Sequence, residues 1–124
     1  MNNQEAWAIY KRYLDAWNTA DVAARVRIAD EVLADDLRYQ TARHDWSTGR
    51  SLVIEDMASF HQKFPGGHFE IGGVSTHHDA SLLLWVIIQA DGTEFARGGD
   101  QITVGRDGKI SKIVTFAPFA SGTD

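Results

Sequence analysis

The chain has no cysteine and only two prolines among its 124 residues. The lack of cysteine excludes a disulfide framework, a thiolate nucleophile and any cysteine-ligated metal centre. The longest apolar run, Leu82 to Ile88, is far shorter than the roughly 18 residues that a membrane span requires. Residues 1–5 lack the basic and apolar regions of a secretory signal. We therefore expect a soluble, cytoplasmic protein that does not associate with membranes.

Positive charge is also scarce, because 12 Lys and Arg residues face 17 Asp and Glu residues, for a net charge of −5. No cluster of basic residues is present, so nucleic acid is not an expected partner. Apolar residues make up 44% of the chain, which is typical of a globular protein. At this length we expect residues 1–124 to form a single domain.

Apolar residues at spacings of three and four predict three helices. The first apolar stripe runs from Ala6 to Trp17, and the polar segment Asn18–Asp21 separates it from a second stripe. The second stripe runs from Val22 to Leu33 and is expected to end near Asp35. A third helix is predicted over Ser51–Phe64, where Pro and Gly follow.

Period-two alternation predicts a short strand over Leu37–Thr41, followed by a loop over residues 42–50. The C-terminal half reads as four further strands, at residues 68–77, 81–90, 93–104 and 109–119. An Asp-Gly pair at residues 91–92 is a strong hairpin signal. The order ααβαββββ predicts an α+β domain with its helices on one face of the sheet.

The apolar run Leu82–Ile88 does not alternate, so it predicts a strand that is covered on both faces. Helices can cover one face, and a second copy of the sheet is the simplest cover for the other. We therefore expect a homodimer through the sheet, with cover by the chain's own loops or tail as the alternative.

Asp100 is the most informative polar residue, because it shares a strand face with Ile102 and Val104. A buried carboxyl group must be paired, hydrogen-bonded or kept neutral by a raised pKa, and such groups gather at functional sites. A structural role, with bonds to the backbone or to Arg97, is the alternative. The preceding Gly98-Gly99 pair indicates a bulge or a close backbone approach.

Tyr13 lies on the apolar stripe of the first helix, where its hydroxyl group needs a polar partner. A purely structural hydrogen bond in the core is the alternative to a functional role. The five histidines show no spacing typical of a metal site, so we expect no bound metal.

Three stretches, Tyr13–Asp21, Leu33–Leu37 and Asp100–Ile110, occur in an order that resembles the nuclear transport factor 2-like superfamily. The most similar branches are the ketosteroid isomerases and the SnoaL-like polyketide cyclases. The resemblance implies a cone-shaped α+β barrel, in which a strongly curved sheet wraps three N-terminal helices around a deep apolar pocket. It also implies dimerisation through the sheet.

In ketosteroid isomerases a helical tyrosine and a protonated aspartic acid form an oxyanion hole, and the resemblance places Tyr13 and Asp100 in these roles. The general base of the isomerases corresponds to Thr41, and the acid–base aspartate of the cyclases falls near Thr115. Neither position holds a carboxylate. The following loop offers His44 and Asp45 as substitute bases, although a solvated loop histidine is the alternative.

The leading hypothesis is an enzyme that moves a proton next to a carbonyl group of a small hydrophobic substrate, in an isomerisation, cyclisation or dehydration. This chemistry needs no metal or organic cofactor. The residues expected to contact the substrate are Trp17, Tyr39, Thr41, Phe60, Trp85, Ile102, Ile113 and Thr115. Non-catalytic binding of a hydrophobic ligand and a dimerisation module are the two alternatives.

Overall fold

The computed structural model describes residues 1–120, and the chain begins with helices α1 (Asn3–Asn18) and α2 (Val22–Val32). Each helix starts at a side-chain cap. The Asn2 side chain accepts a hydrogen bond from the Glu5 amide at 2.8 Å, and the Glu5 carboxylate accepts one from the Asn2 amide. Asp21 caps α2 through one such bond. These caps satisfy amides that the first turn leaves unpaired, and so they define where the helices begin.

Six strands form one sheet in the order β2-β1-β6-β5-β4-β3. The strands are β1 (Leu33–Gln40), β2 (Ser47–Thr48), β3 (His68–His77), β4 (Ala80–Ile88), β5 (Glu94–Val104) and β6 (Ile110–Phe116), with helix α3 (Ser51–Lys63) between β2 and β3. β1 runs parallel to β6, and every other neighbouring pair is antiparallel. The predicted α+β class is thus confirmed, with a mixed sheet.

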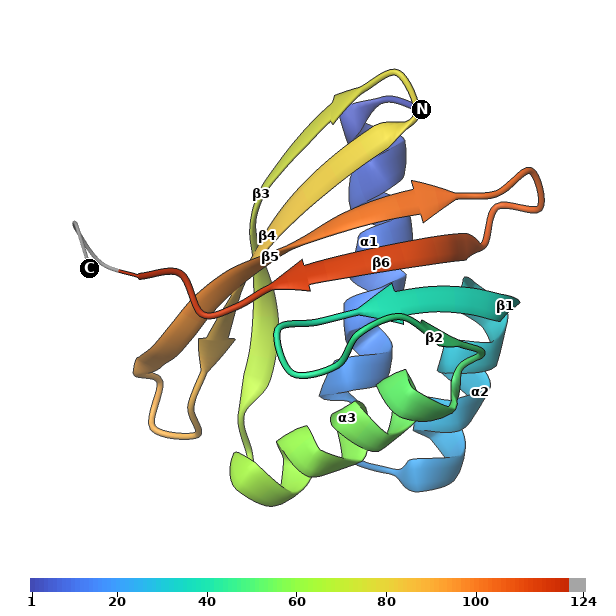
Figure 1. The fold of residues 1–124 in the computed structure, drawn as a ribbon. Coiled ribbons are helices and arrows are strands. Elements are labelled where there is room, and N and C mark those ends of the chain that lie inside the picture. Colours follow the sequence, from blue (N-terminus) through green and yellow to red (C-terminus); the bar gives the residue numbers. More distant parts are fainter. Residues whose placement is uncertain (121–124) are drawn as a thin grey trace.

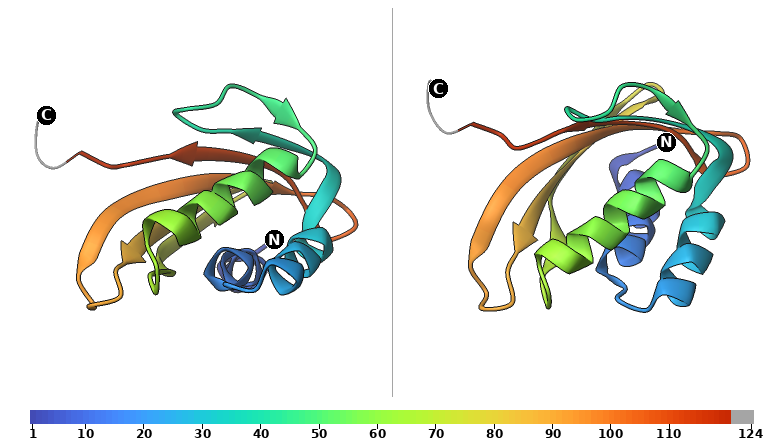
Figure 2. Two further views of the ribbon diagram at one scale, coloured as in Figure 1. Left: turned by 90° about the horizontal axis from the view of Figure 1, so that it is seen from below. Right: turned by 60° about the horizontal axis from the view of Figure 1, so that its bottom comes forward.

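The sheet curves around the helices without closing on itself, and all three helices lie on its concave side (Figures 1 and 2). The concave face and the helices enclose one hydrophobic core, to which α1 contributes Tyr10, Tyr13 and Leu14. The register of β3 against β4 shifts between Ile71 and Gly73, at the predicted Gly72-Gly73 interruption. None of the helices within residues 1–120 is long and apolar enough to cross a membrane.

The strand predicted over residues 109–119 ends earlier, because β6 stops at Phe116. Two other differences affect how strands pair. Leu33 begins β1 instead of ending the second helix, because it pairs with Ile110 of β6. The register shifts between Leu33 and Arg38, so the intervening acidic residues stay exposed within the strand. The predicted loop at residues 42–50 contains β2, whose two residues pair with Arg38 and Tyr39.

The Gly98-Gly99 pair marks a close approach and not a bulge. The two glycines pair in regular register with Trp85 and Leu84 of β4. A Cβ atom at Gly98 would lie 2.6 Å from Cη2 of Trp85 and 2.7 Å from the carbonyl oxygen of Phe116. Only glycine therefore lets the Trp85 ring lie against β5 on the concave face.

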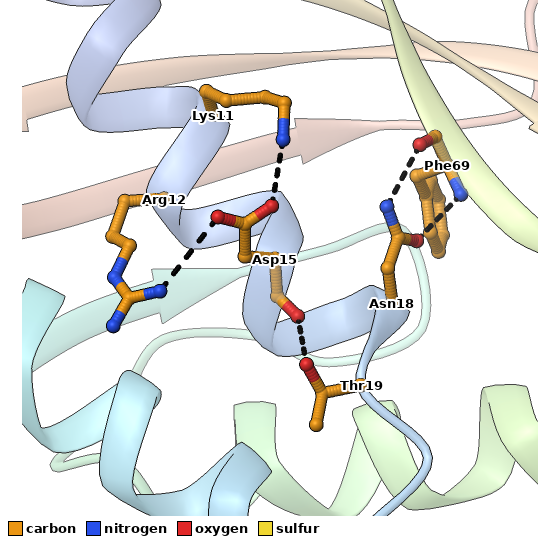
Figure 3. A network of polar contacts seen from close by, with 6 residues as sticks. All are labelled: Lys11, Arg12, Asp15, Asn18, Thr19 and Phe69. Carbon is orange, nitrogen blue, oxygen red and sulfur yellow. Dashed lines mark hydrogen bonds and ion pairs between the residues drawn. The ribbon is translucent and has the colours of Figure 1, made fainter.

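The C-terminal end of α1 is fastened to the outer edge of the sheet (Figure 3). The Asn18 side chain donates to the backbone carbonyl of Phe69 at 2.9 Å and accepts from its amide at 2.7 Å. Asn18 therefore occupies backbone groups that edge strand β3 would otherwise leave unpaired. Nearby, Thr19 donates to the Asp15 carbonyl at 2.6 Å, and Lys11 forms an ion pair with the Asp15 carboxylate.

We predict that Asn18→Ala lowers the free energy of unfolding by about 1–3 kcal/mol, because two partly buried backbone groups of Phe69 lose their partner. Asn18→Asp should also be destabilising, because it keeps the acceptor for the Phe69 amide but places a carboxylate oxygen against the Phe69 carbonyl oxygen. Chemical denaturation measures both, with the exposed α1 residue Gln4→Ala as the control. Equal stability of Asn18→Ala and the control would contradict this role.

The convex face of the sheet carries exposed apolar residues in register across three strands. Leu84 pairs with Gly99, which pairs with Phe116, and the exposed fractions of Leu84 and Phe116 are 36% and 56%. Leu82, also on this face of β4, is 42% exposed. The concave-facing residues of the same run are buried, and so is Val86 on the convex face, so the convex face is exposed mainly at Leu82 and Leu84. Dimerisation through the sheet stays a prediction.

If the convex face is a dimer interface, Leu84→Glu should convert a dimer to a monomer, because it places a charge in an apolar contact. Sedimentation equilibrium measures the mass. Val22→Glu, at an exposed apolar position on α2, is the matched control and should leave the mass unchanged. A wild-type protein that sediments as a monomer would disprove the dimer.

Candidate active site

A cavity of about 580 Å³ lies between α1, α3 and the concave face of the sheet. One part of its wall is aromatic, and it includes Trp17, Phe60, Phe64, Phe69, Trp85 and Phe95. These rings form a chain of mostly edge-on contacts, such as Trp17 with Phe69 at 5.1 Å between ring centroids. The polar side chains in the wall are Tyr13, Tyr39, Thr41, Arg43, Asp56, Ser59, Lys63, Asp100 and Thr115. A largely apolar cavity with a few polar groups is typical of a small-molecule site.

Asp100 reaches the cavity from β5, and both of its carboxyl oxygens accept hydrogen bonds from hydroxyl groups. Tyr10, on α1, donates to Oδ2 at 2.5 Å. Thr115 donates to Oδ1 at 2.6 Å, because it stands directly opposite Asp100 on β6. Asp100 is only 4% exposed. The two donors come from a helix and a strand, so they fix the carboxyl group in one orientation.

Burial dominates the ionisation of Asp100 and raises its pKa from 3.8 to about 6. The hydroxyl groups of Thr115 and Tyr10, and to a smaller extent the Trp85 side chain, favour the charged form and limit this rise. A carboxyl group with a pKa near 6 can both accept and release a proton close to neutral pH.

Tyr13 lies one helical turn beyond Tyr10 and, like Asp100, lines the cavity. Its ring stands edge-on to Trp17, with 6.4 Å between ring centroids. Burial and the neighbouring Asp100 raise the pKa of Tyr13 well above its usual value, so its hydroxyl group stays protonated. The cavity wall therefore contains both a hydroxyl donor and a carboxyl group.

A second polar cluster, which the sequence did not predict, is built around Asp56 of α3. The Tyr39 hydroxyl group donates to Asp56 Oδ2 at 2.7 Å, and His44 Nε2 lies 3.4 Å from Oδ1. Asp56 has an 11% exposed side chain and lines the cavity. Burial raises the pKa of Tyr39, so this tyrosine also stays a donor.

Six of the eight residues expected to contact the substrate line the cavity, namely Trp17, Tyr39, Thr41, Phe60, Trp85 and Thr115. Ile102 and Ile113 do not line it, because they are fully buried in the core. Thr41 uses its hydroxyl oxygen to accept from the amides of Arg43 and His44, which shapes the loop after β1.

The two proposed bases lie outside the cavity wall. His44 does not line the cavity, although its ring lies beside Asp56, which does. Asp45 is exposed, and hydrogen bonds from the Trp46 amide and the Gln40 side chain lower its pKa. Within residues 1–120, no three His, Asp or Glu side chains are grouped closely enough to hold a metal ion.

Sequence reasoning missed Tyr10 and Asp56. Tyr10 was visible as a member of the same apolar stripe as Tyr13, three residues earlier. No local signal distinguishes which of the two tyrosines reaches Asp100. Asp56 lies on an amphipathic helix, where an acidic residue is expected on the solvent-exposed face.

Comparison with known proteins places this architecture in a family. A model of the SnoaL-like domain matches residues 10–113. The structure of a proposed isomerase of the SnoaL-like family from Agrobacterium tumefaciens is 27% identical, with a TM-score of 0.82 over 91% of this chain and 97% of that one. A proposed SnoaL-like polyketide cyclase from Jannaschia is 14% identical, with a TM-score of 0.72 over 92% and 85% of the two chains.

The chain therefore belongs to the SnoaL-like family, within the nuclear transport factor 2-like superfamily. A nuclear transport factor 2-like protein of unknown function from Exiguobacterium shares the fold at 18% identity, with a TM-score of 0.71 over 91% of this chain and 99% of that one. No curated protein matches the sequence.

The raised pKa of Asp100 predicts a specific dependence of stability on pH. Because its pKa is higher in the folded state than the 3.8 of an exposed group, folding favours the protonated form. Protonated Asp100 therefore adds to the free energy of unfolding. This stabilisation is complete below about pH 4, and up to about 3 kcal/mol of it is lost as the pH rises through about 6. Asp100→Asn should abolish this pH-dependent part, as measured by denaturation at each pH.

The exposed Asp79→Asn variant is the control for this measurement, and it should keep the wild-type pH dependence. If Asp100→Asn and the wild-type protein change in parallel between pH 4 and pH 7, the pKa of Asp100 is not raised.

Proposed function

We propose that the protein is an enzyme that moves a proton next to a carbonyl group of a small, largely apolar substrate, as in an isomerisation, cyclisation or dehydration. The observation that carries this proposal is the buried Asp100 carboxyl group, with its pKa near 6, which lines a largely apolar cavity together with Tyr13. Membership of the SnoaL-like family and similarity to a proposed isomerase support it.

In this proposal Asp100 transfers the proton. Resemblance to ketosteroid isomerases implies a neutral Asp100, but two hydroxyl groups that donate to both oxygens favour the ionised form. An ionised Asp100 takes a proton from the carbon next to the substrate carbonyl and later returns it to another atom. Tyr10 and Thr115 are positioning residues, because they act through Asp100.

Tyr13 binds the substrate oxygen in this scheme. Loss of the carbon-bound proton moves negative charge onto the carbonyl oxygen, and a hydroxyl donor aimed at that oxygen stabilises the enolate. The raised pKa of Tyr13 keeps its proton in place at neutral pH. Asp56, fixed by Tyr39, can accept a hydrogen bond from a second polar group of the substrate.

Non-catalytic ligand binding is the second candidate function, and it is favoured by Thr41, which stands where the resemblance places a carboxylate base. The same cavity would then hold a hydrophobic ligand without turning it over. A pure dimerisation module is less well supported, because the cavity of about 580 Å³ leaves room for a ligand.

Exchange of the α-protons of 2-tetralone with D₂O tests proton transfer without knowledge of the natural substrate. We expect the wild-type protein to accelerate exchange, with a rate that rises as the pH passes through about 6, where Asp100 ionises. Asp100→Asn should reduce the catalysed rate by about 10²–10⁴-fold, which is typical of losing a general base. Tyr13→Phe should reduce it by about 10²-fold. Proton NMR follows the reaction.

The exposed Asp79→Asn variant is the control, and His44→Gln and Asp45→Asn test the two bases expected from the sequence. Full activity of Asp100→Asn, together with a loss of activity in His44→Gln, would indicate that the general base lies in the Asp56 cluster. Binding of 2-tetralone without any exchange would favour the non-catalytic function.

A further inference from the structure

The cavity wall formed by α3 and the loop after β1 differs in chemistry from the aromatic wall. Asp56, Ser59 and Lys63 follow one another at spacings of three and four, so they form a single stripe of α3 that faces the cavity. Arg43 joins them from the loop between β1 and β2. Arg43 and Lys63 are both exposed, so they lie at the solvent end of the cavity.

These two cations have no anionic partner of their own within residues 1–120. The carboxyl groups of the cavity contact other side chains instead, since Tyr10 and Thr115 donate to Asp100, and Asp56 contacts Tyr39 and His44. Neither Arg43 nor Lys63 forms an ion pair with them. Two uncompensated positive charges therefore face a cavity in a chain whose net charge is −5.

The position of Lys63 keeps its charge next to the apolar wall. Its ammonium group lies 5.7 Å from the centroid of the Phe64 ring, which also lines the cavity. An apolar ligand resting on that wall would bring any charged substituent at its outer end close to Lys63. Arg43 can add a planar, two-pronged donor, which matches the geometry of a carboxylate.

We propose that the substrate carries a carboxylate group, which Arg43 and Lys63 bind at the solvent end of the cavity. This inference rests on the proposed function, because the apolar body of the same substrate extends inward to place its carbonyl group near Tyr13 and Asp100. A singly charged carboxylate suits this wall better than a doubly charged phosphate, because the Asp56 carboxyl group on the same stripe repels negative charge.

A matched pair of probes, 2-naphthylacetic acid and 2-naphthylacetamide, tests this specificity, because they share one apolar body and differ in charge. Calorimetric titration of the wild-type protein at neutral pH should show the acid binding about tenfold more tightly than the amide. The double variant Arg43→Gln/Lys63→Gln should lose that preference and keep its affinity for the amide. Rising salt should weaken only the binding of the acid.

Arg106→Gln is the control, since Arg106 is exposed in the turn between β5 and β6. Equal binding of acid and amide to the wild-type protein, or an equal loss of both in the double variant, would overturn the carboxylate specificity alone. Failure of both probes to bind would overturn this inference and also count against an apolar substrate. Proton exchange on the neutral 2-tetralone tests the proposed function separately.

Discussion

The desolvated carboxyl group of Asp100 is the constraint that organises the site. Transfer of a carboxylate from water into an apolar interior costs several kcal/mol unless donors replace the lost solvent. Tyr10 and Thr115 replace it, one from α1 and one from β6. The requirement for both donors fixes the first helix against the middle of the sheet. It also fixes Tyr13, one turn later, at the cavity wall.

The second carboxyl group of the cavity, that of Asp56, also accepts a hydrogen bond from a buried tyrosine. A tyrosine of the sheet, Tyr39, holds Asp56 of a helix, whereas a tyrosine of a helix holds Asp100 of the sheet. In both pairs burial raises the pKa of the tyrosine, so the tyrosine stays protonated and donates to the carboxyl group. The cavity thus has two acceptor groups on separate elements, Asp100 on β5 and Asp56 on α3.

The sequence predicted the parts of this arrangement that depend on local periodicity. Alternation placed Asp100 on a buried strand face, and helical spacing placed Tyr13 inward. Local periodicity does not show how deeply a side chain is buried. Ile102 and Ile113 were therefore expected at the cavity, although they lie wholly in the core. The partner of Asp100 could not be found either, since Tyr10 lies 90 residues away.

The boundaries that were predicted wrongly also depend on distant contacts. Leu33 continues an apolar helical stripe, and only its pairing with Ile110 makes it a strand residue. The two residues of β2 are too few to show any alternation, and they form a strand because β1 offers them a partner. The similar apolar pattern of α1 was interpreted correctly because its caps and its apolar face are local features.

The parallel pairing of β1 with β6 has a consequence for how the protein is made. A ribosome releases the chain from its N-terminus, so α1 and β1 emerge long before the strand that β1 needs as a neighbour. Asp100 itself arrives only with β5, and its second donor, Thr115, arrives with β6, so the carboxyl group cannot be held by both hydroxyl groups before then. Pairing across such a long separation slows folding through loop-closure entropy. The site therefore assembles late, and its completion coincides with completion of the sheet.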